Sequence, residues 1–154
     1  MSSQSIASYR LRLQMLFAGA SHLTMDPEVL SHWARYITVL VSGYLEVSVQ
    51  STLDLYAQKR SSPSVASFVS DRLEGFVNLN SDRIGQLLGA FDSSWRESFE
   101  TFLDEEKKAA VNSVVGLRNT IAHGRDTGVT LGSIQRYYQQ CDLVVSFIEN
   151  LCSP

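Results

Sequence analysis

The sequence predicts an all-helical fold, a compact bundle of six or seven helices with one helix much longer than the rest. Helix start signals recur along the chain, and a capping residue stands directly before proline at Asp26–Pro27 and again at Ser62–Pro63. No stretch alternates apolar and polar residues for long enough to indicate a strand. With 154 residues, of which 44% are hydrophobic and 19% charged, the chain is expected to form a single domain over 1–154.

The first two predicted helices cover the N-terminal third of the chain. Apolar residues of the first recur at helical spacing, namely Ile6, Tyr9, Leu13, Leu16, Phe17, Ala20 and Leu23. The second begins after Asp26 and continues without a breaker to about Lys59. It would be roughly 50 Å long, which exceeds the width of a domain of this size. We therefore expect it to be bent or partly covered from outside the core, for example by a partner chain.

Five further helices are expected from their capping residues and apolar spacing, over about 62–76, 81–91, 92–103, 104–124 and 130–151. Ser81 is expected to cap the first helix after the 78–81 loop, and Asp92 or Ser93 the next one. Gly124 is a natural left-handed stop.

Charge and cysteine content restrict the possible partners and compartment. The net charge is −3, so the broad basic surface of a DNA-coating protein is missing; we expect no DNA-specific binding, and only local contacts with nucleic acid. The acidic stretch 92–106 is interpreted as a solvated face, whereas 117–136 carries a local excess of arginine. Cys141 and Cys152 lie roughly 16 Å apart along one helix, too far to bridge, and are expected to be buried thiols in a reducing compartment. With no apolar run long enough to span a membrane, the expected location is cytoplasmic.

The helix predicted to end at Gly124 carries a row of small or polar residues: Asn112, Gly116, Asn119 and His123. A glycine inside a helix costs about 1 kcal/mol relative to alanine, so we expect this row to face a second helix or a ligand. Gly43 in the long helix is the expected crossing point with Gly116, which would bring Glu46 near Arg118 and His123. Arg118 itself interrupts an apolar row and is expected to be half buried.

Arg118 and His123 are an awkward pair within one helix. They are five residues apart, so their side chains point about 140° apart, whereas Asn119 and His123 share a face. The difficulty is removed if the site is shared between two chains. No Gly-rich phosphate loop, nucleophile elbow or metal motif accompanies them, so we expect neither a cofactor nor a metal.

The sequence R-N-T-I-A-H at 118–123 resembles the R-x(4-6)-H signature of HEPN domains, helical proteins that include many metal-independent RNases. Y-L-E at 44–46 and R-Y-Y at 136–138 resemble the RiboL-PSP-type branch in particular, and the resemblance covers nearly the whole chain. It implies a homodimer in which the two motifs face each other across the interface and form one composite RNA-cleaving site.

The resemblance also implies residue roles. His123 would move the proton of the ribose 2'-hydroxyl as that oxygen attacks the phosphorus, Arg118 would neutralise the developing charge, and a 2',3'-cyclic phosphate would result. Asn119 would orient the phosphate or His123, and Glu46 would support the site. The expected RNA-binding residues are Arg125, Arg136 and Tyr137.

The biological role implied is that of a toxin or phage-defence effector, restrained by an antitoxin or another regulatory partner. HEPN toxins paired with a nucleotidyltransferase antitoxin usually carry tyrosine two residues after the histidine; Arg125 stands there instead, which argues against control by modification of that tyrosine. The alternative is a non-catalytic HEPN module for dimerisation or for binding a nucleotide or RNA, in which Arg118 and His123 hold the interface or a phosphate.

Overall fold

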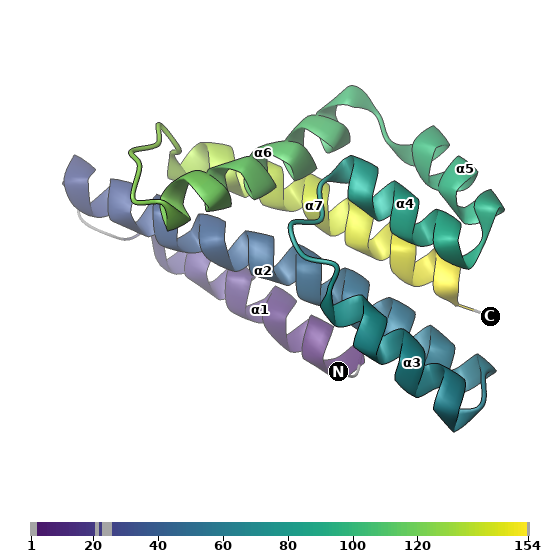
Figure 1. The fold of residues 1–154 in the computed structure, drawn as a ribbon. Helices are drawn as coiled ribbons and strands as arrows, with labels where there is room; N and C mark the ends of the chain where they lie inside the picture. The colour runs from purple at the N-terminus through teal and green to yellow at the C-terminus, as the bar shows by residue number, and fades with distance from the viewer. Residues whose placement is uncertain (1–2, 21, 23–25, 154) are drawn as a thin grey trace.

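The computed structural model describes residues 3–20, 22 and 26–153, and these form seven α-helices and no strand (Figure 1). The predicted all-helical bundle with one long helix is therefore confirmed. Leu23, the last residue assigned to the first predicted helix, lies outside the described residues. The helices are α1 (Ser3–Ala20), α2 (Pro27–Arg60), α3 (Pro63–Glu74), α4 (Ser81–Phe91), α5 (Ser93–Phe102), α6 (Glu105–Ala122) and α7 (Leu131–Cys152).

Side-chain caps begin most of these helices. The Asp26 carboxylate accepts the backbone N–H of Glu28 at 3.0 Å, with Pro27 at the first helical position. Of the two candidates for α5, Asp92 is the cap. The predicted cap of α4 is wrong by one residue: Asn80 accepts the N–H of Arg83 at 2.9 Å, whereas Ser81 is already helical.

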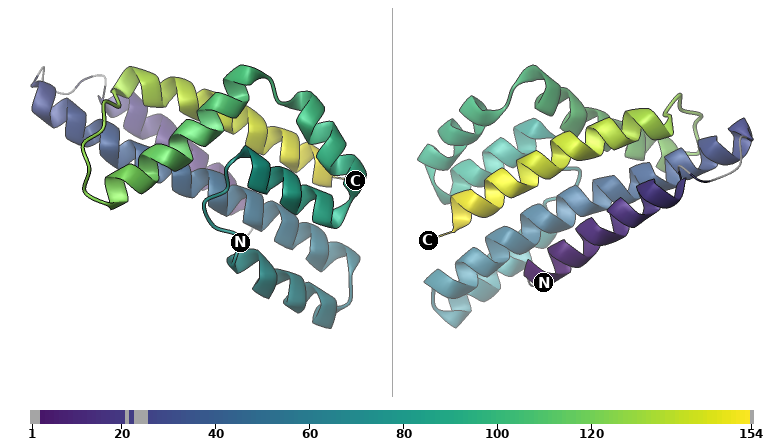
Figure 2. Two further views of the ribbon diagram at one scale, coloured as in Figure 1. Left: turned by 45° about the horizontal axis from the view of Figure 1, so that its top comes forward. Right: turned by 180° about the vertical axis from the view of Figure 1, so that it is seen from behind.

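The long helix α2 is the central element of the bundle. It packs against α1, α3, α6 and α7, so much of its length is covered within the chain (Figures 1 and 2). α4 and α5 form a hairpin beside the C-terminal half of α7, held by the buried ring of Phe99 and by stacking of Phe102 on Phe147. α6 and α7 form another hairpin, which places the start of α7 beside the end of α6.

The acidic residues of 92–106 and the two cysteines differ in how far they are exposed. The acidic residues of 92–106 are exposed as predicted, and Asp92 and Asp104 among them are helix caps. Both cysteines are free; Cys141 is buried as expected, but Cys152 near the end of α7 is only partly buried. In the part of the chain that the structure describes, no helix is both long and apolar enough to cross a membrane.

Candidate functional site

The C-terminal end of α6 is held in a defined geometry by backbone hydrogen bonds. Gly124 has φ +68°, its N–H donates to Ile121 O at 3.0 Å, and the N–H of Arg125 donates to Thr120 O at 3.1 Å. This pair of bonds is a Schellman motif, the left-handed helix ending that glycine favours. It makes His123 the C-cap residue of α6 and confirms the stop predicted at Gly124.

The second half of α6 leaves the hydrophobic core. The buried residues of this helix are Ala110, Val111, Val114 and Val115, and no described residue of α6 beyond Val115 is buried. Leu117 and Ile121 are only partly covered, and Arg118 and His123 are exposed. The prediction that Arg118 is half buried is therefore wrong, because the neighbouring helices do not cover this end of α6.

The side chains of Arg118 and His123, which begin and end the R-x4-H segment at 118–123, make few hydrogen bonds or ion pairs within the chain. Arg118 Nη1 donates a long hydrogen bond of 3.5 Å to Asn119 Oδ1, and neither Arg118 nor His123 has a carboxylate partner among the described residues. No hydrogen bond joins Arg118 to His123. The cationic group and the imidazole are both free to meet a ligand or another chain, but one chain does not assemble them into a site.

The expected crossing of α2 and α6 at their glycines is wrong. A Cβ atom at Gly43 would lie 2.8 Å from the Tyr9 hydroxyl, so this glycine admits α1 rather than α6. A Cβ atom at Gly116 would meet no heavy atom within 4 Å, which shows that its outer side is open in the single chain. Gly116 of the polar row therefore has open space beside it, whereas Asn112 of the same row contacts α4, because its Oδ1 accepts the N–H of Ser81 at 2.9 Å.

Glu46 lies against the loop that precedes α4. Its carboxylate accepts the backbone N–H of Asn78 at 3.0 Å, and no described hydrogen bond or ion pair connects it to Arg118 or His123. The sequence predicts that Glu46 supports the site because a crossing of α2 and α6 at Gly43 and Gly116 would bring it near Arg118. The structure does not show that crossing.

The residues predicted to bind RNA are divided between surface and core. Arg125 lies two residues after His123, and Arg136 lies in the second turn of α7. Both are exposed and unpaired with any described carboxylate. Tyr137 is partly buried and packs on the core, whereas Tyr138 is buried. Asp126 Oδ1 lies 3.9 Å from Arg35 Nη1 of α2. The surface around the end of α6 is therefore locally basic, as the arginine count of 117–136 predicts.

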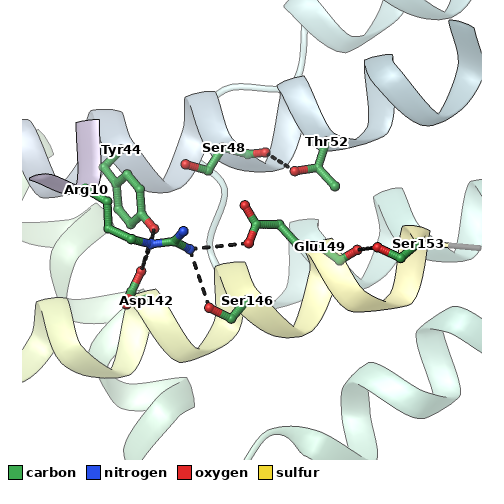
Figure 3. A network of polar contacts seen from close by, with 8 residues as sticks. All are labelled: Arg10, Tyr44, Ser48, Thr52, Asp142, Ser146, Glu149 and Ser153. Atoms are coloured by element: carbon green, nitrogen blue, oxygen red, sulfur yellow. Dashed lines mark hydrogen bonds and ion pairs between the residues drawn. The ribbon is translucent and has the colours of Figure 1, made fainter. Parts of the chain in front are cut away.

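Sequence reasoning missed a polar network inside the bundle, centred on Arg10 of α1 (Figure 3). Arg10 Nε donates to Asp142 Oδ1 at 2.7 Å, and its Nη2 lies 3.4 Å from Glu149 Oε2. The Tyr44 hydroxyl donates to the same Asp142 oxygen at 2.6 Å. The signal was present in the sequence, because Arg10 stands between Ile6 and Leu13 at core spacing.

A model of the RiboL-PSP-HEPN family matches residues 6–153, and the chain belongs to this family. No curated protein and no solved structure matches it. The family match confirms the resemblance carried by R-N-T-I-A-H, Y-L-E and R-Y-Y. HEPN proteins are commonly RNases. Among the described residues, no group of three or more His, Cys, Asp or Glu side chains is placed to hold a metal ion.

Proposed function

We propose that this chain is a metal-independent endoribonuclease of HEPN type whose active site forms between two copies. The observation that carries the proposal is the uncovered second half of α6. Arg118 and His123 project from it without a carboxylate partner among the described residues, and the apolar side chains of Leu117 and Ile121 beside them are only partly covered. A second copy seated on this face would cover the apolar groups and bring Arg118 of one chain to His123 of the other.

In the proposed site, the ribose 2'-oxygen attacks the adjacent phosphorus while His123 accepts its proton. The bond from phosphorus to the 5'-oxygen breaks, the protonated His123 gives a proton to that oxygen, and a 2',3'-cyclic phosphate remains. Arg118 stabilises the charge on the phosphorane oxygens. Asn119 Oδ1 lies 3.5 Å from Arg118 Nη1 and orients the guanidinium. Arg125 and Arg136 hold the RNA backbone on either side, with Tyr137 offering the exposed part of its ring.

The biological role we propose is that of a toxin or phage-defence effector under the control of an inhibitory partner. Expression of the wild-type chain alone should arrest cell growth, whereas expression of His123→Ala at the same level should not. Equal growth of the two strains would contradict the toxin role, but it would not contradict the proposed ribonuclease activity.

The enzymatic proposal is tested by RNA cleavage in excess EDTA. Purified wild type should produce cyclic-phosphate ends, and His123→Ala and Arg118→Ala should each lose about 10²-fold or more of the rate. His32→Ala and Arg72→Ala, which alter exposed residues on α2 and α3, are the matched controls and should cleave like the wild type. RNA that binds through Arg118 but stays intact would instead favour the non-catalytic binding module.

A further inference from the structure

A second site is indicated at the opposite end of the bundle. A cleft of about 680 Å³ lies between the first half of α1, the second half of α2 and the C-terminal end of α7. Its volume falls within the range of small-molecule sites. The cleft and the R-x4-H segment are separated by the length of α7, about 33 Å for its 22 residues. None of the motif residues lines it.

The charges that line the cleft are predominantly positive. Arg10, Lys59 and Arg60 line the cleft with a single carboxylate, Glu149, which lies 3.4 Å from Arg10 Nη2 (Figure 3). Arg10 is also paired with Asp142, at 2.7 Å, just outside the lining. Lys59 and Arg60 have no carboxylate partner among the described residues. The Arg60 guanidinium lies over the ring of Tyr56, 4.7 Å from its centroid. Lys59 and Arg60 are therefore the two positive groups of the cleft that no described carboxylate pairs.

Polar and apolar groups alternate on the remaining wall. The Thr52 hydroxyl, which donates to Ser48 O at 2.7 Å, keeps lone pairs available, and Arg10 Nη1 makes no hydrogen bond within the described residues. Leu55 and the partly buried Cys152 supply apolar surface. A ligand that fits this wall needs an anionic group together with an apolar body.

We propose that the cleft binds a small organic anion, with its phosphate or carboxylate between Lys59 and Arg60 and its apolar body against Leu55 and Cys152. Binding here does not depend on the proposed RNA cleavage, because the two sites share no residue. The Glu149 carboxylate limits the affinity, since it repels an anion and occupies one nitrogen of Arg10.

Calorimetric titration of the full chain with phenyl phosphate tests the proposal, with benzoate, inorganic phosphate and phenol as companions. Phenyl phosphate should bind at one site per chain, and more tightly than inorganic phosphate or phenol, because each of these lacks half of the recognised chemistry. Comparison with benzoate shows whether the anionic subsite prefers phosphate or carboxylate. Failure of both phenyl phosphate and benzoate to bind at millimolar concentration would overturn the proposal.

Variants identify the site. Replacing Lys59 and Arg60 together by Gln should weaken phenyl phosphate binding by about tenfold or more. Glu149→Gln should strengthen it. Arg72→Gln is the matched control, since Arg72 is likewise an exposed arginine over an aromatic ring, 5.1 Å from the centroid of Phe68. Arg118→Ala is a second control, which detects binding at the R-x4-H segment instead of the cleft. Binding that is lost in Arg118→Ala and retained in the Lys59 and Arg60 variant would refute the assignment.

Discussion

Arg10 shows how a single charged residue can hold three helices together. Its side chain is about a quarter exposed, and its guanidinium reaches from α1 to Asp142 and Glu149 on α7, while Tyr44 of α2 shares the Asp142 oxygen. Burial, together with the hydrogen bond to Asp142, raises the pKa of the Tyr44 hydroxyl well above its usual value, which keeps it a donor. Removing the cation would leave two carboxylates without their counter-charge.

Arg10→Met should therefore lower the free energy of unfolding by about 2 kcal/mol, less than for a fully buried ion pair because the site is partly hydrated. Urea denaturation measures the change. Arg12→Met is the matched control: Arg12 is exposed and only reaches the Tyr36 hydroxyl at 3.4 Å, so its loss should change stability by less than about 0.5 kcal/mol. Equal effects of the two substitutions would show that the network does not stabilise the fold.

The two thiols should make the free energy of unfolding fall as the pH rises through the alkaline range. Burial raises the pKa of Cys141 to about 12 and that of Cys152 to about 11, above the value of 9.0 expected without burial. The unfolded chain therefore loses these protons at a lower pH than the folded chain. Their contribution to stability is complete below about pH 9 and declines as the pH rises toward 11 and 12.

Urea midpoints at pH 7, 9 and 10.5 in the presence of reductant measure this effect. The wild type should lose more stability over this range than the Cys141→Ala, Cys152→Ala double variant. The cavity left at position 141 lowers stability at every pH, so only the slopes are compared. Parallel profiles would contradict the raised thiol pKa values.

At the scale of the element, the end of α6 depends on one left-handed residue. Gly124 has φ +68° with open space around its Cβ position, so Gly124→Ala meets a backbone cost without a steric clash. We expect a loss of about 1 kcal/mol in stability and slower RNA cleavage, because His123 precedes this residue. Gly132→Ala, in the open first turn of α7, should be neutral or stabilising. Thermal unfolding of the two variants measures this difference. A stabilising Gly124→Ala would contradict the backbone cost expected at the left-handed end of α6.

Most signals that act within one helical turn could be predicted from the sequence, although the predicted cap of α4 lies one residue late. Contacts between helices could not be predicted in this way. Asp26, Asp92 and Gly124 mark helix ends through bonds to residues no more than a few positions away, so their effects are local. The partner of Gly43 is Tyr9 on another helix, which no local pattern indicates. Arg118 occupies an apolar position in the helical pattern, yet it is exposed because the neighbouring helices do not cover this end of α6.

At the scale of the whole molecule, the open face of α6 is the expected contact between two copies. A side chain at position 116 has free space in the single chain, so Gly116→Leu should fold normally, as circular dichroism would show. The same side chain would obstruct a partner helix, so sedimentation should show a monomer for this variant and the proposed dimer for the wild type, and RNA cleavage should fall with dimerisation. Gly19→Leu, which places the same group in open space on α1, should leave both unchanged. A dimer that survives Gly116→Leu would place the interface elsewhere.

Mixing two inactive variants tests the shared site most directly. Arg118→Ala keeps His123, and His123→Ala keeps Arg118, so each homodimer lacks one of the two functions. The two proteins are unfolded and refolded together, and the mixed dimers are confirmed by native mass spectrometry. These dimers should regain cleavage of RNA to cyclic-phosphate ends in excess EDTA, because the proposed site takes its arginine from one copy and its histidine from the other. Mixed dimers that form and remain inactive would contradict a composite site.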